Sequence, residues 1–269
     1  MSKDKFKRTN VKSTILKKVI IRIDFVGLTD IMSCVTSLKR DVMKGKFKKF
    51  REIKNKNYNV ELNSPNSSQP FNVNMEKKIM FQFSECVIGP SNANFMLGPE
   101  FAYLEIECSE DYEGCNEYIK LMASAIDCIL NFDSFISVKR LGLRKIDVAL
   151  FDDVKMMNQS IEIPIWENYK LAPAYFPLKK SYSDLLFQKD VNTIFNIQRF
   201  IQEIDVNEER KIQYVLDIDC YKNVNLIVAS DFSTTNSIEK IISVQMNEPI
   251  FKYFIETFTE QYINKFYHG

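Results

Sequence analysis

The sequence predicts an α+β fold of two related antiparallel-sheet halves, each backed by amphipathic helices. Residues 77–110 hold three short segments in which apolar and polar residues alternate, separated by Gly-Pro pairs at 89–90 and 98–99. This is the pattern of an antiparallel meander. A segment with apolar residues at helical spacing follows it, and the second half of the chain repeats the plan more weakly.

In the first half, the alternating stretch KKVIIRIDF (17–25) predicts a strand. Thr29 or Asp30 can cap a helix that follows it. Four apolar residues at helical spacing support this helix: Ile31, Val35, Leu38 and Val42. Residues 63–70, rich in Ser, Asn and Pro, predict a surface loop. Residues 113–132 predict a second helix, whose apolar face comprises Tyr118, Ile119, Met122, Ala125, Ile126 and Ile129.

In the second half, strands are expected over 182–190, 192–201 and 211–221. A closing helix is expected to run to the end of the chain, with Pro249 in its first turn. Its apolar stripe comprises Phe251, Phe254, Ile255, Phe258, Tyr262 and Phe266.

A weak internal repeat suggests that the halves are related. YLEIE (103–107) and VLDID (215–219) both alternate apolar and acidic residues. We therefore expect two domains. The first, 1–150, is an α+β half with a basic leading segment, and the second, 151–269, is an α+β half that ends in a long amphipathic helix.

Composition indicates a folded protein without a membrane span. Of the 269 residues 45% are hydrophobic, and no apolar run approaches the ~18 residues of a membrane helix. The N-terminus lacks the apolar core of a secretory signal. The six cysteines show no CxxC spacing, which favours reduced, buried thiols and a cytoplasmic location.

Charge is distributed unevenly along the chain. Residues 1–56 hold 17 Lys and Arg against 5 Asp and Glu, which leaves 19 against 30 for the remainder. This basic segment could contact a nucleic acid or an acidic partner, lie against the protein's own acidic body, or be a solvated surface. Its candidate binding residues are Lys46, Lys48, Lys49 and Arg51.

Motifs for catalysis are missing from the sequence. The single histidine is His268, next to the C-terminus, so neither a histidine-based mechanism nor a histidine metal site is expected. Only seven glycines are present, and neither a GxGxxG nor a Walker-type motif occurs. We therefore predict no catalytic residue and no cofactor.

Two carboxylate pairs are the remaining candidates for chemistry. Glu105 and Glu107, like Asp217 and Asp219, lie two residues apart on a predicted strand and so point to one face. Such pairs could bind Mg²⁺ in a nuclease. The simpler interpretation is a strand with one solvated face.

The stretch RLGLRKID (140–147) changes the phase of its apolar residues twice, near 139–140 and near 144–145. Two β-bulges are expected there, because each phase shift needs an extra residue. Gly142 suits a bend or a close backbone approach. Arg140 and Arg144 are expected to pair with acidic residues of YLEIE or VLDID. The alternative is that these arginines form an anion or partner site.

These motifs together resemble a sporadically distributed family of bacterial proteins. The family has an N-terminal alternating strand (here 19–25), a central RIGLRYIN-like motif (140–147), a late LDID-like strand (216–219) and a closing FxxxxT helix (254–266). This chain departs from it at Lys145-Ile146-Asp147, where an aromatic residue and Asn are usual, and in lacking an early Pro. The resemblance carries over no catalytic residues. The family's scattered distribution is similar to that of toxin–antitoxin and phage-defence genes.

The leading functional hypothesis is a non-catalytic cytoplasmic binding or accessory protein, such as an antitoxin-like, immunity or phage-defence component. A protein partner is expected. The alternatives are a nucleic-acid-associated protein that uses residues 1–56, and a carboxylate-metal nuclease. The sequence leaves the oligomeric state open.

Overall fold

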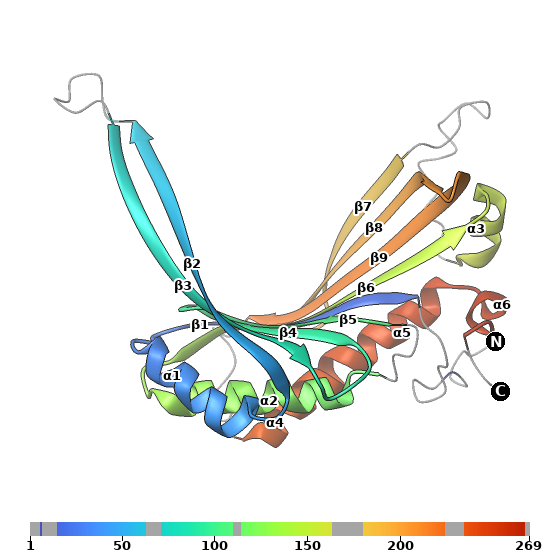
Figure 1. The fold of residues 1–269 in the computed structure, drawn as a ribbon. Coiled ribbons are helices and arrows are strands. Elements are labelled where there is room, and N and C mark those ends of the chain that lie inside the picture. Colours follow the sequence, from blue (N-terminus) through green and yellow to red (C-terminus); the bar gives the residue numbers. More distant parts are fainter. Residues whose placement is uncertain are drawn as a thin grey trace.

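Nine strands form one antiparallel sheet (Figure 1). The computed structural model describes residues 6, 15–62, 71–109, 114–162, 180–223 and 234–266. The strands are β1 (Leu16–Val26), β2 (Phe47–Leu62), β3 (Phe71–Cys86), β4 (Asn92–Leu97), β5 (Phe101–Glu107), β6 (Ser137–Phe151), β7 (Lys180–Gln188), β8 (Thr193–Val206) and β9 (Glu209–Asn223). Their spatial order is β2-β3-β4-β5-β1-β6-β9-β8-β7. The fold is therefore mixed α+β, with a single sheet that spans both halves of the chain.

The predicted strands are confirmed, and β1 lies at the centre of the sheet. It pairs with β5 on one side and β6 on the other. Its alternation is complete, since Val19, Ile21, Ile23 and Phe25 are fully buried while the intervening side chains face away from the core. The meander is confirmed as β3-β4-β5, whose strands pair in succession.

The described helices lie on one face of the sheet (Figure 1). The described helices are α1 (Ile31–Leu38), α2 (Asn116–Phe132), α3 (Val154–Ser160), α4 (Thr235–Lys240), α5 (Glu248–Thr257) and α6 (Glu260–Ile263). Two π-helical segments extend them, η3 (Lys39–Met43) after α1 and η7 (Ile241–Asn247) between α4 and α5. None of these helices is long and apolar enough to cross a membrane.

The first two helices confirm their sequence predictions. The Asp30 side chain accepts a hydrogen bond from the Ser33 amide and caps α1. All six residues of the predicted apolar face of α2 are buried. They join one hydrophobic core that includes residues from both halves of the sheet, such as Leu104 and Leu216.

The closing helix differs from its prediction at both ends. Helical structure begins at Thr235, through α4 and η7, so Pro249 lies in the first turn of α5 but not at the start of the helical stretch. The predicted continuous helix is also interrupted at Phe258, which is extended and bridges Ile161. Thr259 then caps α6 by accepting a hydrogen bond from the Tyr262 amide. A new, separate short helix begins after this cap.

The basic leading segment is not one surface. Its described residues from 15 onward form three separate elements: β1 at the centre of the sheet, α1 with η3 in the helix layer, and β2 at the sheet edge. The strand β2 was not predicted from the sequence, because its first apolar residues, Phe47, Phe50 and Ile53, lie three apart and so do not alternate. The predicted loop at 63–70 and His268 lie outside the described residues.

Candidate functional site

The face of the sheet that no described helix covers is the candidate site, and we call it the open face. Strand alternation places charged side chains on it, in register across the four central strands β5, β1, β6 and β9. Its central charged residues are Lys18, Arg22, Asp24, Glu105, Glu107, Arg140, Arg144, Asp217 and Asp219. The β2–β3 ribbon and strands β7–β9 rise on either side of it (Figure 1).

The two arginines of RLGLRKID pair across β6 and β9, as predicted. Arg144 donates from Nε to Asp217 Oδ1 at 2.8 Å and from Nη2 to Oδ2 at 2.5 Å, a bidentate pair. Arg140 donates from Nη2 to Asp219 Oδ2, and its guanidinium lies 4.3 Å from the centre of the Tyr221 ring. Burial raises the pKa of Asp219, and the neighbouring Arg140 opposes this shift.

One of the two predicted bulges in β6 is present, and the prediction of the other is wrong. Between Asp24–Arg140 and Phe25–Val138 the register skips Lys139, which confirms the first bulge. From Arg140 to Phe151, β6 pairs with β9 without a break. The second irregularity leaves out Lys17 on β1, so the extra residue belongs to the neighbouring strand.

Because β6 keeps its phase, Lys145 and Asp147 point into the helix-covered side. They are 7% and 5% exposed. Burial raises the pKa of Asp147 to about 7. The negative charge of Asp217 also raises this pKa, whereas the positive charge of Lys145 lowers it. The apolar residues Ile146 and Val148 take the opposite, open side. A lysine and an aspartate thus occupy core positions of β6.

The carboxylates proposed for a metal do not converge. In the sheet order, β1 and β6 separate β5 from β9, so the two pairs lie about 14 Å apart at ~4.8 Å per strand. Glu105 accepts a hydrogen bond from Lys18 at 3.0 Å, and Glu107 accepts one from Asn92 at 3.2 Å. Within the described ranges, no group of three His, Cys, Asp or Glu residues is placed to hold a metal ion.

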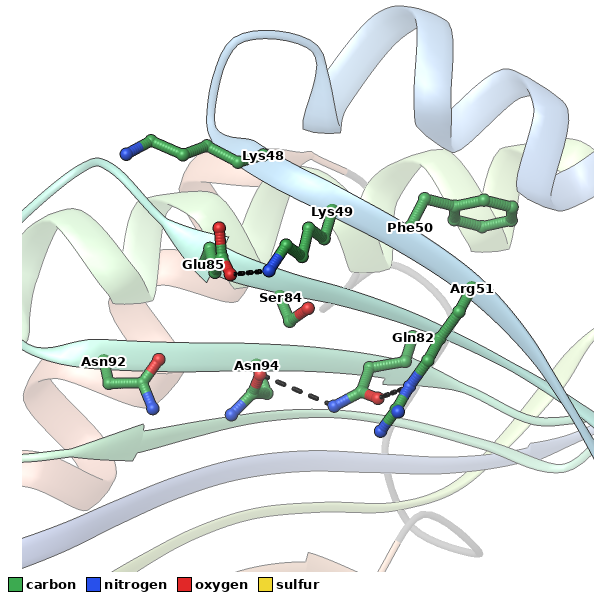
Figure 2. Close-up of a pocket in the computed structure, with 9 residues that line it drawn as sticks. All are labelled: Lys48, Lys49, Phe50, Arg51, Gln82, Ser84, Glu85, Asn92 and Asn94. Atoms are coloured by element: carbon green, nitrogen blue, oxygen red, sulfur yellow. Dashed lines mark hydrogen bonds and ion pairs between the residues drawn. The ribbon is translucent and has the colours of Figure 1, made fainter.

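A polar pocket of about 660 Å³ opens on the same side of the sheet, among β2, β3 and β4 (Figure 2). Three of the four predicted basic residues, Lys48, Lys49 and Arg51, line it. The fourth, Lys46, is in the turn before β2, where its amide bonds to the Met43 carbonyl, and it does not line the pocket. Neither Arg140 nor Arg144 lines it.

The remaining polar wall consists of residues that the sequence reasoning missed. Gln82, Ser84, Asn92 and Asn94 are uncharged and belong to no motif. Strand alternation could have identified these four residues. Each of them is next in sequence to a buried residue, such as Phe83 or Phe95, and successive side chains of a strand point to opposite faces.

A chain of hydrogen bonds orients the pocket side chains. Arg51 Nε donates to Gln82 Oε1, and Gln82 Nε2 donates to Asn94 Oδ1 at 3.5 Å (Figure 2). Glu85 pairs with Lys49. The Glu85 backbone has φ of +58°, a left-handed conformation that is uncommon outside glycine.

Outside this pocket, several cations of the basic leading segment are paired with carboxylates. Lys18 pairs with Glu105, Arg22 with Asp24, and Arg40 with Asp41. Lys18 reaches the acidic strand β5, so this part of the segment lies against the protein's own body, one of the alternatives that the sequence left open.

Comparison with known proteins adds no functional evidence. No family model matches the chain, and no curated protein matches it. Among solved structures, the crystal structure of the di-domain ARO/CYC StfQ from the steffimycin biosynthetic pathway aligns over 89% of this chain and 96% of its own. The sequence identity is 8% and the TM-score 0.18, too low to support an argument about fold or activity.

Proposed function

We propose that the chain is a non-catalytic binding protein that receives a protein partner on the open face. The observation that carries this proposal is the one-sided cover of the sheet, with the described helices on one face (Figure 1) and the ion pairs of Lys18, Arg140 and Arg144 on the other. A nine-stranded sheet face that no described helix covers is wide enough for a macromolecular partner.

The balance of charge on the open face favours protein over nucleic acid. A nucleic-acid surface needs an excess of cations to neutralise phosphates. Here Arg140, Arg144 and Lys18 are each matched by a carboxylate at the centre of the face. Alternating paired charges suit a protein surface of complementary pattern.

The relatedness of the two halves is also a proposal. If the boundary between the halves is moved from 150–151 to before β6, the sheet order divides into β2-β3-β4-β5-β1 and β6-β9-β8-β7, and each half pairs its first strand with the strand that precedes its long helical segment. The ion pair Lys18–Glu105 in the first half corresponds to Arg144–Asp217 in the second when YLEIE is aligned with VLDID. A duplication accounts for both observations.

Membership of the bacterial family that the sequence resembles is proposed on similar grounds. Three of its motifs lie in β1, β6 and β9, which are consecutive neighbours in the sheet. A cytoplasmic role in an immunity, antitoxin or phage-defence complex is the setting that this resemblance suggests. The six cysteines are free, which suits a reducing compartment.

Affinity purification from the native host tests the proposed function. We expect a stoichiometric protein that is retained by the wild type and lost with Arg22→Glu, which reverses a charge at the centre of the open face. Arg40→Glu is the matched control, because Arg40 also pairs with a neighbouring aspartate but lies in the helix layer.

The opposite pattern contradicts the proposal. If Arg40→Glu loses the partner and Arg22→Glu keeps it, the helix layer is the binding surface. If nucleic acid is recovered instead of protein, and its binding weakens steeply with salt, the nucleic-acid hypothesis replaces this one.

A further inference from the structure

We infer that the pocket among β2, β3 and β4 binds carboxylate side chains from an acidic segment of the partner protein. This inference rests on the proposed function and makes it specific. The pocket would recognise the partner by its negative charge.

The charge of the pocket differs from that of the rest of the open face. Lys48, Lys49 and Arg51 line it together with one carboxylate, Glu85, which pairs with Lys49. The Lys48 side chain points away from the other lining residues, so Arg51 is the cation without a carboxylate partner inside the pocket (Figure 2). Glu107 accepts a hydrogen bond from Asn92 but does not line the pocket. A carboxylate of an acidic segment has the complementary charge.

The hydrogen-bond chain presents donors to such a ligand. Arg51 Nε donates a hydrogen bond to Gln82 Oε1, whereas no described residue accepts a hydrogen bond from Arg51 Nη1 or Nη2. The two Nη groups form a planar fork that matches a carboxylate. Because the Asn94 oxygen accepts from Gln82, its amide nitrogen remains as a further donor.

The same pocket is unsuited to a nucleobase. Binding of single-stranded nucleic acid depends on aromatic rings that stack on bases. Phe50 is the one aromatic lining residue, and Figure 2 shows its ring turned away from Gln82 and Asn94. The ring contacts Lys39, whose Nζ lies 4.0 Å from the ring centre, and is nearly parallel to the Phe81 ring, with 6.0 Å between the ring centres.

Fluorescence anisotropy with a labelled oligoglutamate peptide tests the inference on the full chain at low salt. We expect saturable binding that Arg51→Gln weakens about tenfold, the loss of one charged hydrogen-bond pair. Arg210→Gln is the matched control, because it removes the same charge from an exposed strand residue that does not line the pocket. It should leave the affinity unchanged.

A second variant distinguishes a loss of binding from a loss of the fold. Asn94→Asp is nearly isosteric and keeps an oxygen that can accept from Gln82, but it replaces the amide donor of Asn94 with a negative charge, so it should weaken the peptide at least as strongly. Thermal unfolding of both variants confirms that the fold is intact.

Three results would overturn the inference: no saturable peptide binding, equal effects of Arg51→Gln and Arg210→Gln, or tighter binding of a single-stranded oligonucleotide of the same net charge. These results are distinct from failure of the proposed function. If a host partner is still lost with Arg22→Glu, the open face binds protein and only the pocket assignment is wrong.

Discussion

At the residue scale, Lys145 and Asp147 are the most informative departure from the sequence prediction. The apolar residues of 140–150 change phase, and the usual explanation is a bulge that keeps apolar side chains on the core. Here β6 pairs with β9 without a break, and the charged residues enter the core instead. Local hydrophobicity could not predict this, because the uninterrupted pairing with β9 is a long-range property.

The buried Asp147 carboxyl should make folding stability depend on pH. Its pKa is about 7 in the folded protein against an ordinary value of 3.8, so the folded state holds a proton that the unfolded state has released. This contribution is fully present below pH 4 and is lost as pH rises through 7. The slope is at most about 1.4 kcal/mol per pH unit.

Urea unfolding of the wild type and Asp147→Asn between pH 4 and pH 8 measures this effect. The variant lacks the titrating carboxyl, so its stability relative to the wild type should rise with pH across this window. A difference that stays constant would mean that Asp147 titrates at its ordinary value. Asp184→Asn, on the exposed strand β7, is a control for loss of a carboxylate.

Two glycines should respond very differently to alanine. Gly27 has φ of +92°, and a Cβ there would lie 2.1 Å from the Phe135 carbonyl oxygen. At Gly142 the nearest contact would be 3.3 Å, to the Tyr221 Cβ, with no positive φ. Gly27→Ala should therefore cost more than about 2 kcal/mol, and Gly142→Ala less than about 1 kcal/mol. Equal losses in chemical denaturation would contradict this assignment of the turn and the strand.

At the element scale, prediction succeeded where a single local signal decides the structure. The alternation in 17–25 and in the meander identified the strands, and Asp30 identified the start of α1. It failed at β2, whose first apolar residues lie three apart instead of alternating, and at the final helix, which Thr259 divides. For the pocket, lysine and arginine were found from charge, but the amides that orient Arg51 have no signature in one sequence.

Thr259 should stabilise the end of the chain as a helix cap. Its Oγ1 accepts from the Tyr262 amide, and its own amide donates to the Ser160 carbonyl at 2.8 Å. Thr259→Ala should cost about 1 kcal/mol, whereas Thr259→Ser keeps the cap oxygen and should cost less. Denaturation midpoints of the two variants measure the difference, and equal midpoints would mean that the cap hydrogen bond contributes nothing.

At the scale of the whole molecule, the strand groups β2-β3-β4-β5-β1 and β6-β9-β8-β7 meet through hydrogen bonds between β1 and β6. Sequence patterns do not specify this pairing, because β1 lies at the start of the chain and β6 follows α2. The central pair makes one sheet of nine strands, and one hydrophobic core lies beneath it. Which strands become neighbours is decided by packing between distant segments.

A continuous sheet over a shared core should unfold as one unit, although the chain is longer than most two-state domains. Hydrogen exchange at the amides of β4 and β8, one from each half, should report the same free energy of opening. Leu143→Ala removes a fully buried side chain from β6 and should lower both values together by about 2–5 kcal/mol. If only β8 responds, or if urea produces two transitions, the halves are separate folding units joined at β1 and β6.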